Sequence, residues 1–380
     1  MEGANGSEVR LVPYEPKRIL NTHRHVDGGW LWTKYGAHPY IGCQGGCAYC
    51  YWRDEKYNML ARDPAASHLS DPFSQYIKVK TNAPELLRKE LSRARKDVVN
   101  VGDYQPAEEK YRLSREMLKV CAELAFPTLV LEKSPLVLKD LDVISKINER
   151  SWACVIFSIV RGDSEEYGKI FEPNAPRIEG RFRAMRKIAD AGILTGTAFM
   201  PILPYICDDD SNLETVVKKT AQNGGRFVMA AGLTMSGAQA TYFIEALKKH
   251  EPKLVEKYEK LYAGAYSPLD TEYSGRIGLK VRELCAKHGI LDRMPRYIPD
   301  GPLATNKRIA EEVFNTCYCM ELESAPSYKT WAYRKAGWTI DELDQDISAL
   351  YKKQGIKGLQ TLPNIGPSLA AFLAERLDSI

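Results

Sequence analysis

Three cysteines in one short, glycine-rich loop constrain this 380-residue chain more than any other feature of its sequence. Cys43, Cys47 and Cys50 stand at Cys-x3-Cys-x2-Cys spacing, with glycines before and between them and tyrosines beside the last one. Clustered thiolates are typical ligands of iron–sulfur clusters, and a [4Fe-4S] cluster usually takes four of them. With only three, one iron keeps an open position for a small molecule. We therefore expect Cys43, Cys47 and Cys50 to hold a [4Fe-4S] cluster whose chemistry starts at the open iron.

Two plainer interpretations fit the same loop. The three cysteines with a fourth ligand such as His38 would make a zinc site, and reduced thiols need no metal at all. Structural zinc sites usually pair two short Cys or His hooks across a longer insert. No second Cys-x2-Cys or His-x3-His hook follows in the sequence, which favours the iron–sulfur interpretation.

The composition is typical of a globular protein in a reducing compartment. With 44% hydrophobic and 27% charged residues, the chain has enough length and apolar content for one large domain and a small one. Nine cysteines are an odd number, and oxidation would waste the clustered trio, so we expect no disulfide framework. We see no secretion signal and no run of about 18 apolar residues, so we expect a cytoplasmic protein without a membrane partner. The net charge of +4 does not by itself predict a nucleic-acid partner.

Apolar, β-branched runs alternate with amphipathic helical runs, which predicts βαβ units around a parallel sheet. The expected strands cover 35–41, 97–101, 128–131, 153–159, 195–201 and 226–230. The expected helices cover 84–96, 108–124, 137–149, 178–190 and 213–222, followed by 238–249, 252–262, 275–288 and 304–314. Six βα units predict an open barrel, whose active site lies at the carboxyl ends of the strands. The proline- and glycine-rich stretch 295–302 looks like a boundary, so we expect a core over 1–300 and a helical region over 301–380.

Polar residues follow the expected strands, and their order carries a family resemblance. They are Asp103-Tyr104-Gln105-Pro106-Ala107-Glu108, then Glu132-Lys133-Ser134, then Ser158, and finally Glu172-Pro173 and Arg181. Together with the cysteine loop, this order resembles the radical SAM superfamily, and within it the spore photoproduct lyase-like branch, over roughly residues 30 to 240. The first stretch is one residue shorter between its Asp and Gln than in that branch.

The resemblance implies a partial (β/α)6 barrel and S-adenosylmethionine (SAM) bound to the open iron. In that superfamily, an electron from the reduced cluster cleaves SAM to methionine and a 5′-deoxyadenosyl radical, which abstracts hydrogen from a substrate. An unidentified reductase would supply the electron. The resemblance also implies that the SAM amino group, carboxylate or ribose is held by Asp103, Gln105, Ser134, Ser158, Glu172 and Arg181.

Simpler roles stand beside these. Asp103 and Ser134 fit helix caps, and Arg181 fits a surface ion pair. Tyr49 lies next to Cys50 and fits a cover for the cluster or the adenine, although aromatic filling of the loop is the plainer account. Lys133 would meet the SAM carboxylate or a substrate phosphate, yet exposed lysines are common. In Asp208-Asp209-Asp210, we expect Asp210 or the following Ser211 to cap a helix rather than a metal site.

Cys317 and Cys319 flank a tyrosine in the expected helical region. Our hypothesis is that one of them donates a hydrogen atom to a substrate radical, as lesion-repairing relatives must do. Burial without a chemical role is the simpler interpretation, because free cysteine is among the most buried residue types. An auxiliary cluster would need further ligands from elsewhere in the chain.

The C-terminal stretch 355–370 reads Gly-Ile-Lys-Gly-Leu-Gln-Thr-Leu-Pro-Asn-Ile-Gly-Pro-Ser-Leu-Ala and resembles a helix-hairpin-helix, expected over about 354–380. In that motif, backbone amides at the second helix approach a nucleic-acid phosphate. The residues expected at nucleic acid are Lys357, Ile365, Gly366 and Ser368. A compact helical tail that packs on the barrel or meets a protein partner is the alternative.

Together these features predict a radical SAM enzyme that acts on nucleic acid, with DNA lesion repair by a photoproduct lyase-like reaction as the first hypothesis. Radical modification of RNA or of a peptide is the enzymatic alternative. A cluster- or zinc-stabilised nucleic-acid-binding protein without catalysis is the other. Fold and branch do not establish the substrate.

Overall fold

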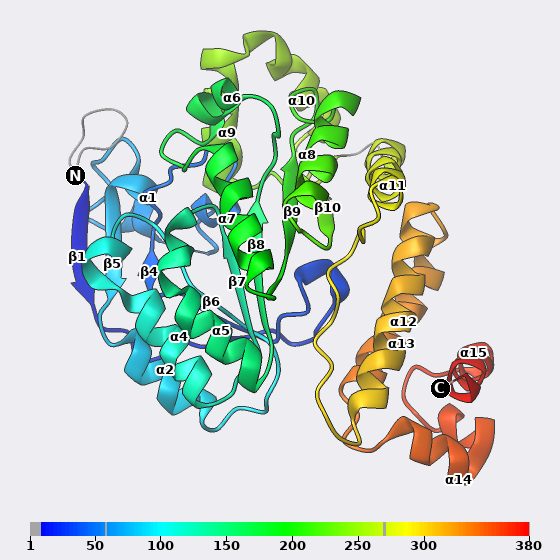
Figure 1. Cartoon of the computed structure of the whole chain (residues 1–380). Coiled ribbons are helices and arrows are strands. Elements are labelled where there is room, and N and C mark those ends of the chain that lie inside the picture. Colours follow the sequence, from blue (N-terminus) through cyan, green and yellow to red (C-terminus); the bar gives the residue numbers. More distant parts are fainter. Residues whose placement is uncertain (1–8, 58, 269–270, 380) are drawn as a thin grey trace. The chain divides into compact units, whose positions relative to one another are not determined.

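The computed structural model describes residues 9–57, 59–268 and 271–379. They divide into two compact units (Figure 1). The first contains the chain up to Thr22 and Tyr35–Met294, and the second contains His23–Lys34 and Pro295–Ile380. The sequence placed the division after residue 300 and gave no sign that twelve residues near the N-terminus join the C-terminal unit. In the described part of the chain, no helix combines the length and apolar character needed to cross a membrane.

The first unit is built on a seven-stranded sheet in the order β10-β9-β8-β7-β6-β3-β2. Its strands are β2 Asn21–Thr22, β3 Tyr35–Ala37, β6 Val99–Val101, β7 Thr128–Glu132, β8 Ala153–Ser158, β9 Leu194–Ile202 and β10 Val228–Gly232. Only β2 is antiparallel, and the other six strands are parallel and follow one another in chain order. The predicted alternation of strands and helices around a parallel sheet is therefore confirmed. The closure of this sheet into a partial barrel stays a prediction.

A second, three-stranded sheet was not predicted. Its order is β1-β5-β4, formed by β1 Arg10–Tyr14, β5 Tyr76–Lys80 and β4 Tyr40–Ile41. The expected strand 35–41 is thus two short strands in different sheets. Pro39 lies between them, and proline cannot donate to a strand ladder. The cysteine loop consequently leaves the small sheet, at the end of β4.

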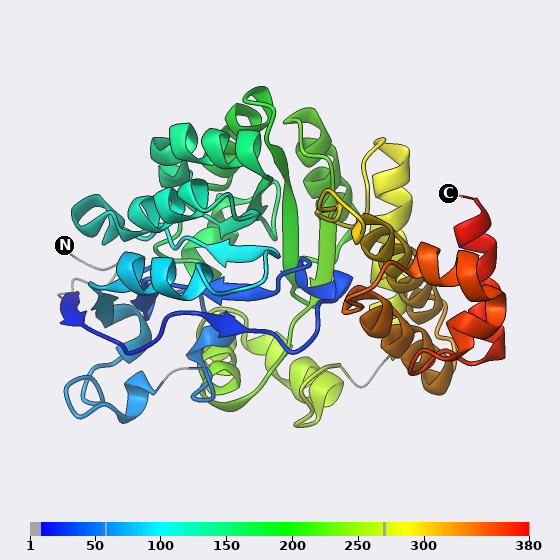
Figure 2. The ribbon, with the colours of Figure 1, turned by 90° about the horizontal axis from the view of Figure 1, so that it is seen from below.

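Helices cover the main sheet. The helices of the first unit are α1 Pro72–Gln75, α2 Ala83–Leu91, α3 Glu108–Tyr111, α4 Leu113–Glu123, α5 Leu141–Arg150, α6 Glu165–Phe171, α7 Ile178–Asp190, α8 Asp210–Gln222, α9 Gly237–His250, α10 Val255–Tyr262 and α11 Thr271–Lys287. Short 3-10 turns occur at η2 Tyr51–Arg53, η3 Leu60–Arg62, η4 Pro135–Asp140 and η5 Pro252–Leu254. Figures 1 and 2 show α2, α4 and α5 as neighbouring helices beside the strands. The expected helix 108–124 is broken at Arg112, which adopts a left-handed conformation (φ 50°).

The core lies between the sheet and these helices. Helices α4, α5, α7, α8 and α11 all contact main-sheet strands. In β8, Val155, Ile156 and Phe157 are each fully buried, as expected for a parallel strand covered on both faces. This buried frame fixes the strand ends where the predicted site residues lie.

The second unit consists of helices. They are η1 Gly28–Trp30, α12 Ala304–Leu322, α13 Ser327–Asp341, α14 Ile347–Gln360 and α15 Pro367–Asp378. The N-terminal segment is anchored by Trp32, which is 1% exposed, lies edge-on to Phe314 at 5.7 Å and carries the Arg296 guanidinium over its ring at 4.8 Å. Arg296 and Lys307 share the buried carboxylate of Asp341, with Lys307 at 3.0 Å.

The chain ends in two helices joined by a short turn. Gly355 has φ 61° and ψ −155° and kinks α14, and the turn at 361–366 leads to α15. Leu362 and Ile365 are buried in this turn, and Asn364 adopts a left-handed conformation. These helices lie where the hairpin was expected. Its identity as a helix-hairpin-helix and its binding to nucleic acid stay predictions.

Candidate active site

The cysteine loop is shaped by its glycines. Gly42 has φ +89°, and a Cβ atom there would lie 2.8 Å from the carbonyl oxygen of Phe73. The Cys43 N–H donates to that same carbonyl at 2.9 Å. Gly46 has φ +63° and lets the loop turn back, with its N–H donating to the Cys43 carbonyl at 3.3 Å. These positions need the left-handed backbone that only glycine adopts at no steric cost.

Arg53 fixes the loop from one side. It is 7% exposed and donates from Nε to the Cys47 carbonyl at 2.8 Å and from a terminal nitrogen to the Gly46 carbonyl at 2.9 Å. Its guanidinium also pairs with Asp71 at 2.7 Å and lies 3.7 Å from the ring centroid of Tyr242. Arg53 was not predicted from the sequence, because its side-chain partners Asp71, which precedes α1, and Tyr242 of α9 are brought to it only by folding.

Gln105 fixes the loop from the other side. Its Oε1 accepts the Gln44 N–H at 3.0 Å, and its Nε2 donates to the Gly42 carbonyl at 3.2 Å. Gln44 in turn accepts the Ala107 N–H at 2.8 Å. The observed bonds of Gln105 hold the loop backbone, and its expected contact with SAM stays a prediction. The loop is therefore held by buried side chains on two sides.

The three thiols suit an iron–sulfur cluster. Burial raises the pKa of Cys43 and Cys50 and raises the pKa of Cys47 to about 12. Such thiols stay protonated until a cation binds beside them, because bound metal cations stabilise thiolates. Among the described residues, no three His, Cys, Asp or Glu side chains are arranged to hold a single metal ion. A four-iron cluster takes each thiolate on a different iron, so its ligands need not converge on one point.

A buried network around Glu172 joins several predicted residues. The Glu172 carboxylate accepts hydrogen bonds from the Tyr49 hydroxyl and from the Arg181 guanidinium, and Lys133 Nζ lies 3.1 Å from it. Lys133 also donates to the Tyr49 hydroxyl at 3.0 Å and to Ser158 Oγ at 2.7 Å. Tyr49, Ser158, Glu172 and Arg181 thus lie together, and the expected alternative of a surface ion pair for Arg181 is wrong, because that residue is 1% exposed.

The charges of this network do not cancel. Burial opposes ionisation of Glu172, but Lys133 and Arg181 outweigh it and lower the pKa of Glu172 to about 2. Two cations therefore surround one carboxylate. The Lys133 side chain is 20% exposed, whereas those of Glu172 and Arg181 are at most 2% exposed. The excess positive charge is thus presented at Lys133, where an anionic group would be attracted.

Carboxylates gather at the ends of β6 and β7. Asp103 accepts a hydrogen bond from Gln105 Nε2 at 3.2 Å, and Glu132 accepts the Tyr104 N–H at 2.8 Å. Burial, followed by the charges of Glu132 and Glu108, raises the pKa of Asp103 well above its usual range. Burial also raises the pKa of Glu132 to about 7. A cation beside these two groups would relieve the cost of their ionisation.

Some predicted residues have simpler roles in the structure. Ser134 Oγ accepts the Leu136 N–H at 3.3 Å and caps η4, as its alternative interpretation proposed. Asp103 caps no helix, because α3 begins after Ala107. The cap of α8 is Asp209, whose carboxylate accepts the Asn212 N–H at 2.9 Å, and not Asp210 or Ser211 as expected. The three consecutive aspartates diverge: Asp208 accepts from Tyr273, Asp209 pairs with Arg161 and Asp210 pairs with Lys280.

Cys317 and Cys319 belong to the second unit, on α12. Cys317 is buried and donates to the Thr330 carbonyl at 3.3 Å, which ties α12 to α13. Two residues apart on a helix, the cysteines face different directions and do not form a ligand pair. Their proposed hydrogen donation stays a hypothesis.

The predicted nucleic-acid residues differ in exposure. Lys357, Gly366 and Ser368 are exposed, but Ile365 is 4% exposed, and its N–H donates to the Leu362 carbonyl at 3.3 Å. Ile365 therefore belongs to the interior of the hairpin.

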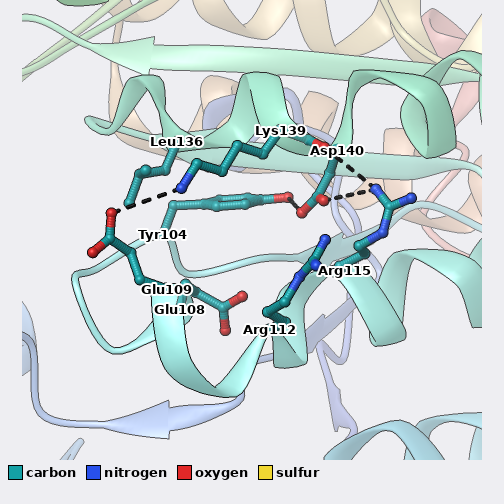
Figure 3. Close-up of a pocket in the computed structure, with 8 residues that line it drawn as sticks. All are labelled: Tyr104, Glu108, Glu109, Arg112, Arg115, Leu136, Lys139 and Asp140. Atoms are coloured by element: carbon teal, nitrogen blue, oxygen red, sulfur yellow. Dashed lines mark hydrogen bonds and ion pairs between the residues drawn. The ribbon is translucent and has the colours of Figure 1, made fainter.

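A small pocket lies on α3, α4 and η4 and includes Tyr104 (Figure 3). Its volume of about 30 Å³ leaves room for little more than a water molecule. Figure 3 shows the Tyr104 hydroxyl directed at Asp140, to which it donates at 2.8 Å, with Arg115 holding the same carboxylate at 2.9 Å. The contacts among Tyr104, Asp140 and Arg115 support the strand end that carries Asp103. The pocket itself is too small for a cofactor.

Comparisons with known proteins fit this architecture. No protein-family model matches the chain. An uncharacterized protein of Mycobacterium tuberculosis is 29% identical over 262 residues, which are 67% of this chain and 74% of that protein. An uncharacterized protein of Methanocaldococcus jannaschii is 28% identical over 206 residues, covering 53% of this chain and 71% of that protein.

Among solved structures, spore photoproduct lyase complexed with dinucleoside spore photoproduct superposes with a TM-score of 0.54 at 18% identity, covering 75% of this chain and 80% of that one. A mutant of the same lyase with bound AdoMet and the same dinucleoside also has a TM-score of 0.54, at 16% identity. Most of this chain therefore has the fold of spore photoproduct lyase.

Proposed function

We propose that this protein is a radical SAM enzyme. The observation that carries the proposal is the pairing of a three-cysteine loop, fixed on both sides by Arg53 and Gln105, with the buried network around Glu172. When bound, the [4Fe-4S] cluster and SAM supply the reductive cleavage of SAM that yields methionine and a hydrogen-abstracting 5′-deoxyadenosyl radical. The lyase fold supports the proposal, because a form of that enzyme is known with bound AdoMet.

The chain's own residues divide the work of holding SAM. Lys133, backed by Arg181 and Glu172, offers net positive charge to the SAM carboxylate. Asp103 and Glu132 offer oxygen acceptors to the SAM ammonium group, whose positive charge would favour their ionisation against the burial that raises their pKa values. Tyr49, fixed by its bonds to Glu172 and Lys133, closes one side of the loop.

We further propose that the substrate is nucleic acid, with a lesion in DNA as the first candidate. The lyase of the same fold is known in complex with a dinucleoside photoproduct. The exposed Lys357, Gly366 and Ser368 suit contacts with phosphates, since a helix N-terminus and a lysine both attract them.

The cofactor part is tested by anaerobic reconstitution with iron and sulfide. We expect about four irons per chain, brown absorption near 400 nm, and SAM binding to the reconstituted protein. Cys47→Ala should lose all three, and Cys121→Ala, which removes a buried thiol outside the loop, should keep them. Stoichiometric zinc with no iron, or equal behaviour of the two variants, would contradict the proposal.

The substrate part is tested by adding UV-irradiated or intact duplex DNA to the reduced holoenzyme with SAM. Faster SAM cleavage and disappearance of the lesion with irradiated DNA alone are expected. If DNA does not change the rate of SAM cleavage, the DNA proposal is contradicted and RNA and peptides become the next substrates to test. The cofactor proposal would still stand.

A further inference from the structure

The second unit contains a pocket of a size suited to a ligand. Its volume is about 420 Å³, within the range of roughly 300 to 1,000 Å³ that is typical of small-molecule sites. It is lined by His25, Asp27, Glu321, Trp331, Arg334 and Trp338. All of them come from the N-terminal segment, α12 and α13, inside one compact unit. None of them was assigned a role by the proposed function.

Aromatic rings form one side of the pocket. His25 stacks on Trp338 with ring centroids 4.3 Å apart and planes 11° apart. Trp331 lies edge-on to Trp338, with ring centroids 6.1 Å apart, and is 51% exposed. Exposed indole surface of this kind stacks well on a flat heteroaromatic ligand.

Polar groups in the pocket are fixed by one another. Arg334 donates to Asp27 and to Glu321, and its guanidinium lies 5.8 Å from the Trp331 ring centroid. His25 Nδ1 lies 2.8 Å from the Glu342 carboxylate. The Trp338 Nε1–H is buried and has no hydrogen-bond partner among the described residues, which is unfavourable for a buried donor. The pocket thus offers both donors and acceptors in fixed positions beside the rings.

We infer that this pocket binds an unstacked nucleobase. A base is flat and carries amino, carbonyl and ring-nitrogen groups that match carboxylate acceptors and guanidinium donors. Asp27 and Glu321 outnumber Arg334, so a phosphate is disfavoured inside the pocket. The sugar-phosphate chain then stays outside, where the exposed Lys329 and Lys335 of α13 are available to it.

This inference rests on the proposed nucleic-acid substrate and adds that single-stranded or extruded bases are the form recognised. Each base stacked on an aromatic side chain strengthens binding, so the loss of one ring has a measurable effect. The contribution is tolerant of sequence, because every base has a flat face.

The test is fluorescence anisotropy of a labelled single-stranded DNA hexamer with the full-length protein. Trp331→Ala should weaken binding about tenfold, and Trp331→Phe should restore most of it. Tyr328→Ala is the matched control, because Tyr328 is 77% exposed, lies on the same helix and does not line the pocket. Unlabelled adenosine, which has no phosphate, should compete with the hexamer for wild type and not for Trp331→Ala.

Equal hexamer affinities for Trp331→Ala and Tyr328→Ala would overturn the inference, as would competition by tetramethylammonium but not by adenosine. The measurement needs neither cluster nor SAM. A protein that cleaves no SAM but binds the hexamer less tightly after Trp331→Ala would contradict the proposed function alone. A protein that cleaves SAM but binds the hexamer equally well after Trp331→Ala would contradict this inference alone.

Discussion

Glu172 is the residue on which the candidate site depends most. It is 2% exposed and contacts Lys133 directly after β7, Arg181 of α7 and the Tyr49 hydroxyl of the cysteine loop. A buried carboxylate with such partners stays ionised, and its negative charge in turn stabilises the two cations. One side chain therefore holds together three segments that are distant in the sequence.

Glu172→Gln should lower the free energy of unfolding by about 3 kcal/mol at pH 7, because Lys133 and Arg181 lose their buried counter-charge. The pKa of Glu172 falls from 4.5 in the unfolded chain to about 2 in the folded protein. Its contribution is thus fully present above pH 4.5 and is lost as pH falls toward 2. Urea unfolding from pH 7 down to pH 3 should show the gap between wild type and variant narrowing. A gap that is constant with pH would rule out this assignment.

Arg53→Lys should reduce iron loading while leaving the three cysteines in place. Lysine keeps the charge but cannot bind Asp71 and the loop carbonyls at once, as the forked guanidinium does. Iron content after reconstitution measures the effect, with the exposed, ion-paired Arg88→Lys as control. Full loading of Arg53→Lys would show that the loop needs no such support.

At residue level, the sequence could predict much of the site. Glycine and cysteine spacing pointed to the loop, and the strand-end order pointed to Ser158, Glu172 and Arg181. Arg53 carries no local signal, since its role comes from Asp71 and Tyr242, which only folding brings near. Ser134 caps η4, which is the simpler of the two roles that the sequence suggested, and its contact with SAM stays a prediction.

Elements followed the periodicity of the sequence where they are long and buried. The ranges of α7 and β8 match their predictions closely, since their apolar residues face one continuous core. The strand expected over 35–41 failed at Pro39, and the helix expected over 108–124 failed at Arg112. The small sheet was missed because β1 pairs with β5, 66 residues later, and that pairing has no local pattern.

The proposed DNA contact of the C-terminal hairpin can be tested at single residues. Gly366→Ala should leave stability nearly unchanged, because a Cβ there would meet no atom within 4 Å. The methyl group would nevertheless obstruct a phosphate approaching the start of α15, and binding to duplex DNA should weaken.

Lys357→Glu should weaken duplex binding for all sequences and reduce its salt dependence, with Lys260→Glu, on the first unit, as control. Unchanged duplex affinity in both hairpin variants would remove the hairpin from the DNA contact.

On the scale of the whole molecule, the two units are built from interleaved parts of the chain. The segment His23–Lys34 leaves the first unit between β2 and β3 and supplies Trp32 to the second. No composition signal marks this exchange, because a tryptophan in a short loop is equally compatible with either unit. The second unit's stability therefore depends on residues at the other end of the sequence.

Trp32→Ala should destabilise the second unit by about 3–5 kcal/mol, the usual cost of removing a buried tryptophan. Hydrogen exchange in the full-length chain should speed up in α12 and α13 and stay slow in β8 and β9. Tyr328→Ala, on the exposed surface of α13, is the control and should change neither. Uniform acceleration in both units would show that they unfold as one.

The most direct measurement is the amount of 5′-deoxyadenosine formed when the reconstituted, reduced protein is given SAM without oxygen. We predict formation by wild type, none by Cys47→Ala, and strongly reduced formation by Lys133→Met, which keeps an unbranched side chain but removes its charge. A wild-type protein with a complete cluster that forms no 5′-deoxyadenosine, with or without DNA, would contradict the assignment of radical SAM chemistry to this site.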